Sequence, residues 1–449
     1  MKRNIELSLL NWKNSKNHLP LLLQGARQVG KSFIVENWGK NYFENVVIIN
    51  FELYPEYIKC FNSLEPNEIL KAIMALSKQK IVATKTLLFL DEIQECPNAI
   101  QALRYFKEKC PQLHVIGAGS LLEFILNDAK FRMPVGRIQF MYLKPMSFQE
   151  YLFNAGYEDL QKYIQNATIE SGIPEPVHLK LLKLVKEYFV IGGMPAAVQE
   201  YLVTQNFMNV QTIQTNLLNT YRLDFGKYAS RAEHKYLRQL FAKAPSLIAQ
   251  HFKFSKVDPD IRAREFKSSL EMLCYAGLIA PVSMTAATGL PLDSLKNDKK
   301  FKLLFLDIGL VSRTSQLEAE VMLNEDIFLV NRGALAEQFV GQELRAYVPF
   351  TEEAQLYFWC REKPSSTAEV DYIISIGQNI IPLEVKAGTT GQLKSLKIFM
   401  VEKKSKLGIH ISQSSLQFEN ALLSLPIYMI SELPRLVKLC GSVAKNGSF

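Results

Sequence analysis

The sequence predicts a multidomain α/β protein with a parallel sheet first, a mostly helical middle, and a second α/β region last. Short apolar segments alternate with helical patterns over roughly the first third of the chain, which is typical of parallel strands buried on both faces. Helical periodicity then dominates, and apolar strands return near the end. Because 449 residues are too many for one ordinary core, we expect domains at 1–150, 151–324 and 325–449.

The first domain is expected to form a five-stranded sheet. Each expected strand is short and apolar, and helical patterns lie between them, so both faces of the sheet should be covered. The strands are expected at 20–25, 46–52, 86–92, 114–120 and within 136–147, and the helices at 31–38, 68–79 and 99–110.

The middle region is expected to begin with helices and to end as a winged helix. Helical patterns occupy 147–153, 178–190 and 216–225, and a segment with two prolines and a glycine interrupts them at 171–178. Residues 233–282 resemble a helix-turn-helix followed by a strand, 285–300 a wing loop, and 302–307 the closing strand. The last domain should contain a helix at 332–347 and strands at 356–360, 368–376 and 380–387.

Composition predicts a cytoplasmic protein. No apolar run is long enough to span a bilayer, and the N-terminal segment lacks the continuous apolar region of a signal peptide. The six cysteines include no CxxC pair, so we expect reduced thiols rather than disulfides or a zinc site. The net charge of +8 allows contact with nucleic acid, but an ordinary solvated basic surface explains it equally well. We expect no contact with a membrane.

A phosphate-binding loop is predicted by the eight residues that follow the first strand. They fit the pattern GxxxxGK[ST] and are Gly25, Ala26, Arg27, Gln28, Val29, Gly30, Lys31 and Ser32. In such a loop, backbone N–H groups and the start of the next helix face phosphate oxygens. Lys31 is expected to reach the β and γ phosphates and Ser32 to hold Mg²⁺. The predicted cofactors are therefore ATP and Mg²⁺.

Two acids at the end of the third expected strand complete this site. Asp91 is expected to act on the Mg²⁺ shell, and Glu92 to orient or deprotonate the attacking water. Two acids at a strand end are often merely solvated, but their position behind a phosphate-binding loop favours hydrolysis of ATP.

Further candidates lie beyond the fourth strand. Ser120 is predicted to sense the γ-phosphate, although a serine after a glycine is also common in loops. Arg132 and Arg137 are candidates for an arginine finger that reaches the nucleotide of a neighbouring subunit, which would require a homo-oligomer. The alternative is that they are surface or structural arginines.

A second candidate site is predicted in residues 368–388, AEVDYIISIGQNIIPLEVKAG. Asp371 lies in one expected strand, and Glu384 and Lys386 share a face of the next, with Val385 pointing into packing. Two acids and a lysine suit metal-dependent cleavage of phosphodiesters, because the acids bind Mg²⁺ and the cations stabilise charge on phosphate.

This arrangement matches the D…ExK signature of the PD-(D/E)xK nuclease fold. Glu337 matches the acid that this fold often places on the preceding helix, so the predicted metal ligands are Glu337, Asp371 and Glu384. A solvent-facing hairpin with alternating charges is the alternative. Cleavage is a separate hypothesis, because a fold does not imply an activity.

The motifs together resemble the AAA-type ATPases of bacteria and archaea that carry a C-terminal domain of uncharacterised function. The resemblance rests on GARQVGKS, LLFLDEIQ, VIGAGSLLEF and PVGRIQFMYLKPMSFQEYL, and it continues in GGMP, LDIGL and residues 368–388. It covers nearly the whole chain, and it implies ATP binding.

The favoured hypothesis is an ATP-driven protein that binds or processes DNA. Arg262, Arg264 and Lys267 lie near the start of the expected recognition helix, where they suit DNA phosphates, although this helix could equally pack between domains. The alternative hypothesis is an ATP-dependent switch or scaffold whose C-terminal domain is an inert interaction module. A metabolic kinase is a weaker third interpretation, because no substrate pocket is recognisable.

Overall fold

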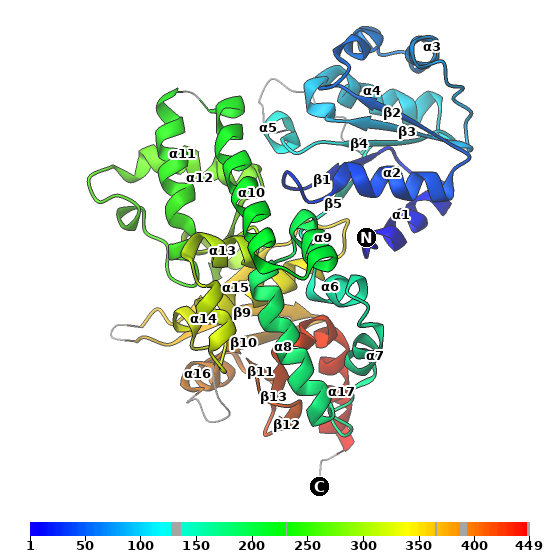
Figure 1. The fold of residues 1–449 in the computed structure, drawn as a ribbon. Coiled ribbons are helices and arrows are strands. Elements are labelled where there is room, and N and C mark those ends of the chain that lie inside the picture. The colour runs from blue at the N-terminus through cyan, green and yellow to red at the C-terminus, as the bar shows by residue number, and fades with distance from the viewer. Residues whose placement is uncertain (127–135, 230, 364–365, 387–392, 447–449) are drawn as a thin grey trace. The chain divides into compact units, whose positions relative to one another are not determined.

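The structure, a computed structural model, describes residues 1–126, 136–229, 231–363, 366–386 and 393–446 (Figure 1). These residues form two compact units. The first unit consists of Met1–Lys144, Tyr275–Leu278 and Val348–Glu353, and the second of Pro145–Cys274, Ile279–Tyr347 and Ala354–Phe449. None of the described helices combines the length and apolar composition needed to cross a membrane.

A five-stranded sheet forms the centre of the first unit. Its strand order is β2-β3-β4-β1-β5, and every neighbouring pair is parallel. The strands are β1 (Leu21–Gln24), β2 (Asn45–Asn50), β3 (Thr86–Asp91), β4 (His114–Ala118) and β5 (Gln139–Tyr142). The helices are α1 (Ile5–Asn14), α2 (Lys31–Tyr42), α3 (Pro66–Ser77), α4 (Pro97–Lys109) and α5 (Leu122–Leu126). The prediction of a parallel sheet with helices is confirmed.

Burial on both faces explains why these strands are apolar along their whole length. All residues of β1, β3 and β4 are buried. Leu88 and Leu90 of β3 belong to a core cluster that also contains Ile69 of α3 and Leu103 of α4. Parallel strands therefore show no alternation between polar and apolar residues, and the sequence marks them by short apolar runs instead.

The second unit begins with helices, as expected. These helices are α6 (Phe148–Asn154), α7 (Glu158–Asn166), α8 (Glu175–Ile191), α9 (Pro195–Thr204), α10 (Phe207–Tyr228), α11 (Arg231–Lys243) and α12 (Ala263–Tyr275). Further along the chain lie α13 (Ile308–Ser315), α14 (Glu318–Leu323), α15 (Ala334–Ala346), α16 (Lys394–Lys403) and α17 (Leu433–Asn446).

An eight-stranded mixed sheet runs through the second unit in the order β12-β13-β11-β10-β9-β8-β6-β7. The strands are β6 (Ile279–Thr285), β7 (Lys296–Phe305), β8 (Leu356–Cys360), β9 (Glu369–Ile376), β10 (Asn379–Val385), β11 (Gly408–Ser412), β12 (Gln417–Glu419) and β13 (Leu422–Pro426). The β6–β7 hairpin lies where we expected a wing, and β6 pairs with β8 in parallel. The expected boundary at 324/325 thus falls within one hydrogen-bonded sheet, and the winged helix stays a prediction.

Two motifs of unexplained purpose meet in the interior of the second unit. Asp307, in the sequence LDIGL, accepts hydrogen bonds from the backbone N–H groups of Gly309 and Leu310 at the start of α13. Its other oxygen accepts from the N–H of Gly193, in the sequence GGMP, at 2.6 Å. Burial raises the pKa of Asp307 to about 6, although these backbone donors lower it. Both motifs are therefore accounted for by local structure.

Candidate functional site

The predicted phosphate-binding loop lies between the end of β1 at Gln24 and the start of α2 at Lys31. Gly25 has φ 150° and Gly30 has φ 93°, a region that side-chain-bearing residues rarely adopt. A Cβ atom at Gly25 would also overlap the carbonyl oxygen of Leu143. The loop conformation therefore requires glycine at both positions of the motif.

Lys31 lies inside this loop and is almost fully buried. Its Nζ donates to the carbonyl oxygens of Gly25 at 2.8 Å and Ala26 at 2.9 Å. Burial lowers the pKa of Lys31 to about 8, against the opposing attraction of Glu92 and Asp91. Because the loop partners are neutral oxygens, an arriving phosphate would supply the negative charge that this buried ammonium favours.

Ser32 and Asp91 are far apart in sequence but adjacent in the structure. The hydroxyl of Ser32, on α2, donates to Asp91 Oδ1 at 3.0 Å, and Asn50 Nδ2 at the end of β2 donates to Asp91 Oδ2 at 3.0 Å. Burial raises the pKa of Asp91, with the Ser32 hydrogen bond opposing it. A hydroxyl and a carboxylate are oxygen ligands of the kind that Mg²⁺ prefers, so these side chains fit the predicted cation.

Glu92 adopts a left-handed backbone conformation directly after β3, with φ 48°. Its Oε2 accepts a hydrogen bond of 2.6 Å from Nε2 of Gln94, a residue whose role the sequence did not reveal. The amide oxygen of Gln94 lies beside Gly119 at the end of β4, and the predicted sensor Ser120 is the next residue and is buried. Gln94 therefore holds the predicted catalytic acid and lies beside the residue that precedes the predicted sensor.

The remaining residues of the first unit differ in their surroundings. Val29 is buried, and its carbonyl accepts from Arg3 Nη1 at 3.1 Å, a contact that the sequence did not predict. Arg27 is half-buried and Gln28 is exposed. Arg137 donates to Glu108 at 3.3 Å on the surface, as a structural arginine would. Arg132 lies outside the described residues.

The second predicted site brings together acids from a hairpin and a helix. β9 and β10 pair antiparallel, with Leu383 opposite Tyr372, so Asp371 and Glu384 are also neighbours. Asp371 Oδ2 accepts from the N–H of Val385 at 2.9 Å. Glu337 lies on α15. With Glu369 of β9, these residues form what we call the carboxylate cluster: Glu337, Glu369, Asp371 and Glu384.

A lysine that the sequence did not reveal lies among these acids. Nζ of Lys302, on β7, lies 2.8 Å from Glu337, 2.7 Å from Glu369 and 3.4 Å from Asp371. Its side chain is only 2% exposed. Although burial alone would lower the pKa of Lys302, the surrounding carboxylates raise it well above its usual value.

Among the acids of the cluster, the pKa of Glu369 is lowered and the pKa values of Glu337 and Glu384 are raised. Burial alone would raise the pKa of Glu369, but hydrogen bonds from His251 and Lys302 lower it to about 2. The pKa values of Glu337 and Glu384 are both raised to about 8. Burial is the main cause and neighbouring Asp371 adds to it, while Lys302 opposes the rise at Glu337 and Lys386 opposes it at Glu384.

The expected orientation around Lys386 differs from the structure. Glu384 is buried, Val385 is half-buried and Lys386 is exposed just beyond the end of β10. Because four consecutive residues of β10, Ile381 to Glu384, are buried, both faces of the strand are covered there and simple alternation does not apply. Across the described ranges, no group of three or more His, Cys, Asp or Glu side chains is arranged to hold a metal ion.

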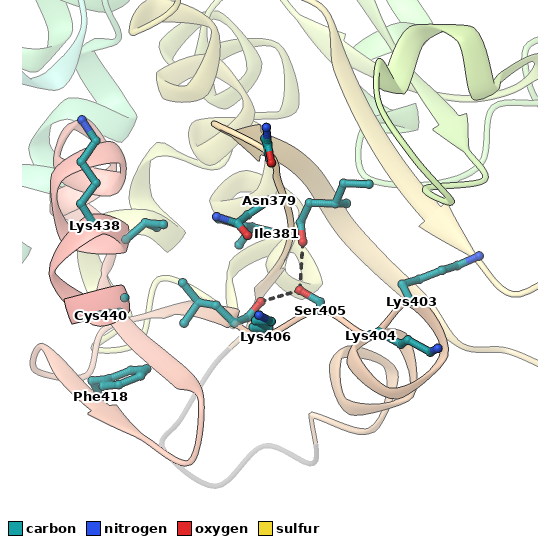
Figure 2. A pocket seen from close by; sticks show the side chains of 14 residues that line it. Asn379, Ile381, Lys403, Lys404, Ser405, Lys406, Phe418, Lys438 and Cys440 are labelled. Carbon is teal, nitrogen blue, oxygen red and sulfur yellow. Dashed lines mark hydrogen bonds between the residues drawn. The ribbon is translucent and has the colours of Figure 1, made fainter. Parts of the chain in front are cut away.

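The second unit also contains a pocket of about 890 Å³ near the β9–β10 turn (Figure 2). Its lining includes four lysines: Lys403, Lys404, Lys406 and Lys438. Oγ of Ser405 lies 2.9 Å from the carbonyl oxygens of Ile380 and Leu407, which share its one hydroxyl proton, and this contact fixes the loop between α16 and β11 (Figure 2). The predicted basic residues Arg262, Arg264 and Lys267 form a separate exposed group at the start of α12.

Comparison with family models assigns three parts of the chain. Residues 17–152 match the model of an AAA domain. Residues 182–321 and 332–429 match two domains of unknown function, DUF8612 and DUF4143. With its parallel sheet and glycine loop, the first unit is an AAA-type P-loop domain. The nuclease-like assignment of the last domain stays a prediction.

Solved structures give weaker likenesses. A Walker-type ATPase of Pyrococcus abyssi is 17% identical, with 70% of this chain and 95% of that chain covered and a TM-score of 0.45. The ORC2 protein of Aeropyrum pernix is 13% identical over 71% and 92% of the two chains, with a TM-score of 0.34. The branch migration motor RuvB of Thermotoga maritima is 15% identical over 62% and 86%, with a TM-score of 0.29. No curated protein matches the chain.

Proposed function

We propose that this protein binds ATP with Mg²⁺ at residues 25–32 and hydrolyses it. The observation that carries the proposal is the contact of 3.0 Å between Ser32 and Asp91, beside a buried lysine whose loop partners are neutral carbonyls. Loop N–H groups and Lys31 bind the phosphates, and Ser32 and Asp91 hold the cation. The cation neutralises charge that develops on the phosphates during transfer.

Glu92 is the general base in this proposal. It orients or deprotonates the attacking water, and Gln94 holds its carboxylate in place through the hydrogen bond of 2.6 Å. Ser120 follows the adjacent strand β4 and serves as the contact that senses the γ-phosphate.

The test separates binding from turnover. Glu92→Gln should retain ATP affinity, measured by calorimetry, and lose at least ~100-fold in phosphate release. Glu95→Gln is the matched control, because Glu95 is an exposed acid on the same turn. Unchanged turnover in Glu92→Gln would show that Glu92 is not the general base. Only the nucleotide-binding part of the proposal would then stand.

As the output of the ATPase we propose binding of nucleic acid by the second unit, without cleavage. The four lysines that line the pocket suit a phosphate backbone, whose neutralisation makes affinity fall steeply with salt. Cleavage would need a divalent cation among Glu337, Asp371 and Glu384, and the first two of these already hold Lys302. This supports the hypothesis of a C-terminal module that binds but has no catalytic role.

Two double variants identify the binding surface. Lys404→Ala/Lys406→Ala should weaken binding of double-stranded DNA about tenfold. The slope of log affinity against log salt concentration should also become shallower, by up to about two, because two phosphate contacts are lost. Arg262→Ala/Lys267→Ala removes the same number of exposed charges from the start of α12 and should have little effect. The opposite result would move the interface to α12, and salt-independent or absent binding would leave an ATP-dependent switch without nucleic acid.

A further inference from the structure

The carboxylate cluster already contains a cation of its own. Lys302 reaches oxygens of Glu337, Glu369 and Asp371 within 3.4 Å, and an ammonium group has three N–H donors. The ring of Phe358 lies beneath it, 5.4 Å from Nζ to the ring centroid. The ammonium is thus surrounded by acceptors, and its side chain is almost completely removed from solvent.

The remaining oxygens offer little to a divalent cation. Mg²⁺ requires near-octahedral oxygens at about 2.0–2.1 Å, whereas Asp371 Oδ2 accepts from Val385 and Glu369 Oε2 from His251 at 2.6 Å. Glu384 Oε2 is buried without a hydrogen-bond partner among the described residues. A single buried oxygen cannot supply the several oxygen ligands that Mg²⁺ requires.

We propose that Lys302 is the resident cation of the carboxylate cluster, so that the second unit folds and acts without a divalent metal at this position. The lysine joins the β6–β7 hairpin to α15 and β9, because its three partners lie on those two elements. The cluster is then a structural ion network, and the acids that resemble a nuclease signature hold the sheet together instead of cutting DNA.

Binding of Mn²⁺ to the full chain tests this proposal directly. All measurements use a protein that carries Asp91→Asn, which removes the predicted cation ligand of the first unit. Electron paramagnetic resonance then measures free Mn²⁺ in a titration without nucleotide, so that bound Mn²⁺ is obtained by difference. We expect no sub-millimolar Mn²⁺ site in this background. Lys302→Met should lower the unfolding temperature of the second unit and create one Mn²⁺ site, with partial recovery of stability on adding the metal.

Matched variants keep the result interpretable. Lys300→Met alters an exposed lysine of the same strand, which pairs with Glu362, and it should change neither stability nor Mn²⁺ binding. Lys302→Arg retains a cation and should stay free of Mn²⁺. If Lys302→Met does not fold, the background protein and Lys302→Arg still decide the question.

Two outcomes would overturn the proposal. One is a tight Mn²⁺ site in the Asp91→Asn background that disappears when Asp371→Asn is added, because the cluster would then be a metal centre. The other is a Lys302→Met protein as stable as its parent with or without Mn²⁺. Neither depends on ATP turnover, so a failure of the proposed ATPase would be seen separately.

Discussion

Each of the two units buries a lysine near carboxylates, Lys31 in the first unit and Lys302 in the second. The partners of these lysines differ. Lys31 lies in a site whose positive charge a ligand can neutralise, whereas the charge of Lys302 is already neutralised by the protein. Lys31 donates to two neutral carbonyls of its own loop. Lys302 donates to Glu337 and lies within 3.4 Å of two further carboxylates. Burying a charge whose direct hydrogen-bond partners are neutral is costly, and the attraction of nearby Glu92 and Asp91 offsets this cost only in part. Binding of a phosphate would relieve the rest.

The pKa directions express the same contrast. Burial lowers the pKa of Lys31 to about 8, whereas the carboxylates around Lys302 raise its pKa well above the usual value despite burial. In a ligand-binding site, the missing partner is supplied by the ligand. In the cluster, three carboxylates of the protein already surround the ammonium of Lys302, so no ligand is needed to neutralise it.

The largest expected effect is the loss of ATP binding in Lys31→Ala. Removing the buried ammonium should weaken ATP affinity by at least ~100-fold, about 3 kcal/mol. The first unit should remain folded, because among the described residues Lys31 donates to backbone carbonyls and leaves no paired carboxylate behind. Calorimetric titration with ATP and thermal unfolding measure the two effects. Lys40→Ala, at an exposed position of the same helix, is the control and should bind normally.

Lys302→Met should show the reverse pattern. Removing one partner of a buried ion network costs about 3–5 kcal/mol, so the free energy of unfolding of the second unit should fall by that amount in urea titrations. ATP affinity should change little. An equal loss of ATP affinity would contradict the distinction drawn between the two lysines.

The pH dependence of stability should have opposite signs in the two units. The raised pKa of Glu384, about 8 against an ordinary 4.5, means that the folded state keeps a proton which the unfolded state releases. Its contribution is fully present below pH 4.5 and is lost as pH rises through 8, on the order of 5 kcal/mol. The lowered pKa of Lys31, about 8 against 10.5, means that the folded state binds fewer protons, so the stability of the first unit should rise between pH 8 and 10.5.

Urea titrations at pH 5, 7, 9 and 10 measure these slopes. Glu384→Gln mimics the protonated acid, so it should flatten the decline in the second unit, and Lys31→Met should flatten the rise in the first. A decline that persists unchanged in Glu384→Gln would assign it to another carboxyl, such as Glu337.

How much could be predicted from the sequence depends on how local each feature is. The five parallel strands follow from short apolar runs, and the phosphate-binding loop consists of consecutive residues, so both could be predicted. The proximity of Asp371 and Glu384 follows from a tight hairpin that fixes their register. Such features need only neighbouring residues to be recognised.

Lys302 could not be found in this way, because its partners come from other elements. It precedes Glu337 and Asp371 by 35 and 69 positions, and it begins the expected closing strand directly after the lysine-rich segment that suggested a wing loop. One local signal existed: Lys302 directly precedes the apolar run of β7, whose last four residues, from Lys302 to Phe305, are all buried in the structure. Because a lysine is rarely buried unless it is paired, a lysine at the edge of an apolar run indicates that acids are buried nearby.

The smallest expected effect concerns Gln94, which sharpens the description of the ligand-binding site. Gln94 donates to Glu92 at 2.6 Å, and among the described residues no hydrogen bond joins it to the phosphate-binding loop. Gln94→Ala should therefore lower kcat about tenfold and leave KM for ATP nearly unchanged. Gln112→Ala, an exposed glutamine of the same unit, is the control. A rise in KM with constant kcat would show that Gln94 supports nucleotide binding, and Glu92 would then be positioned by the backbone alone.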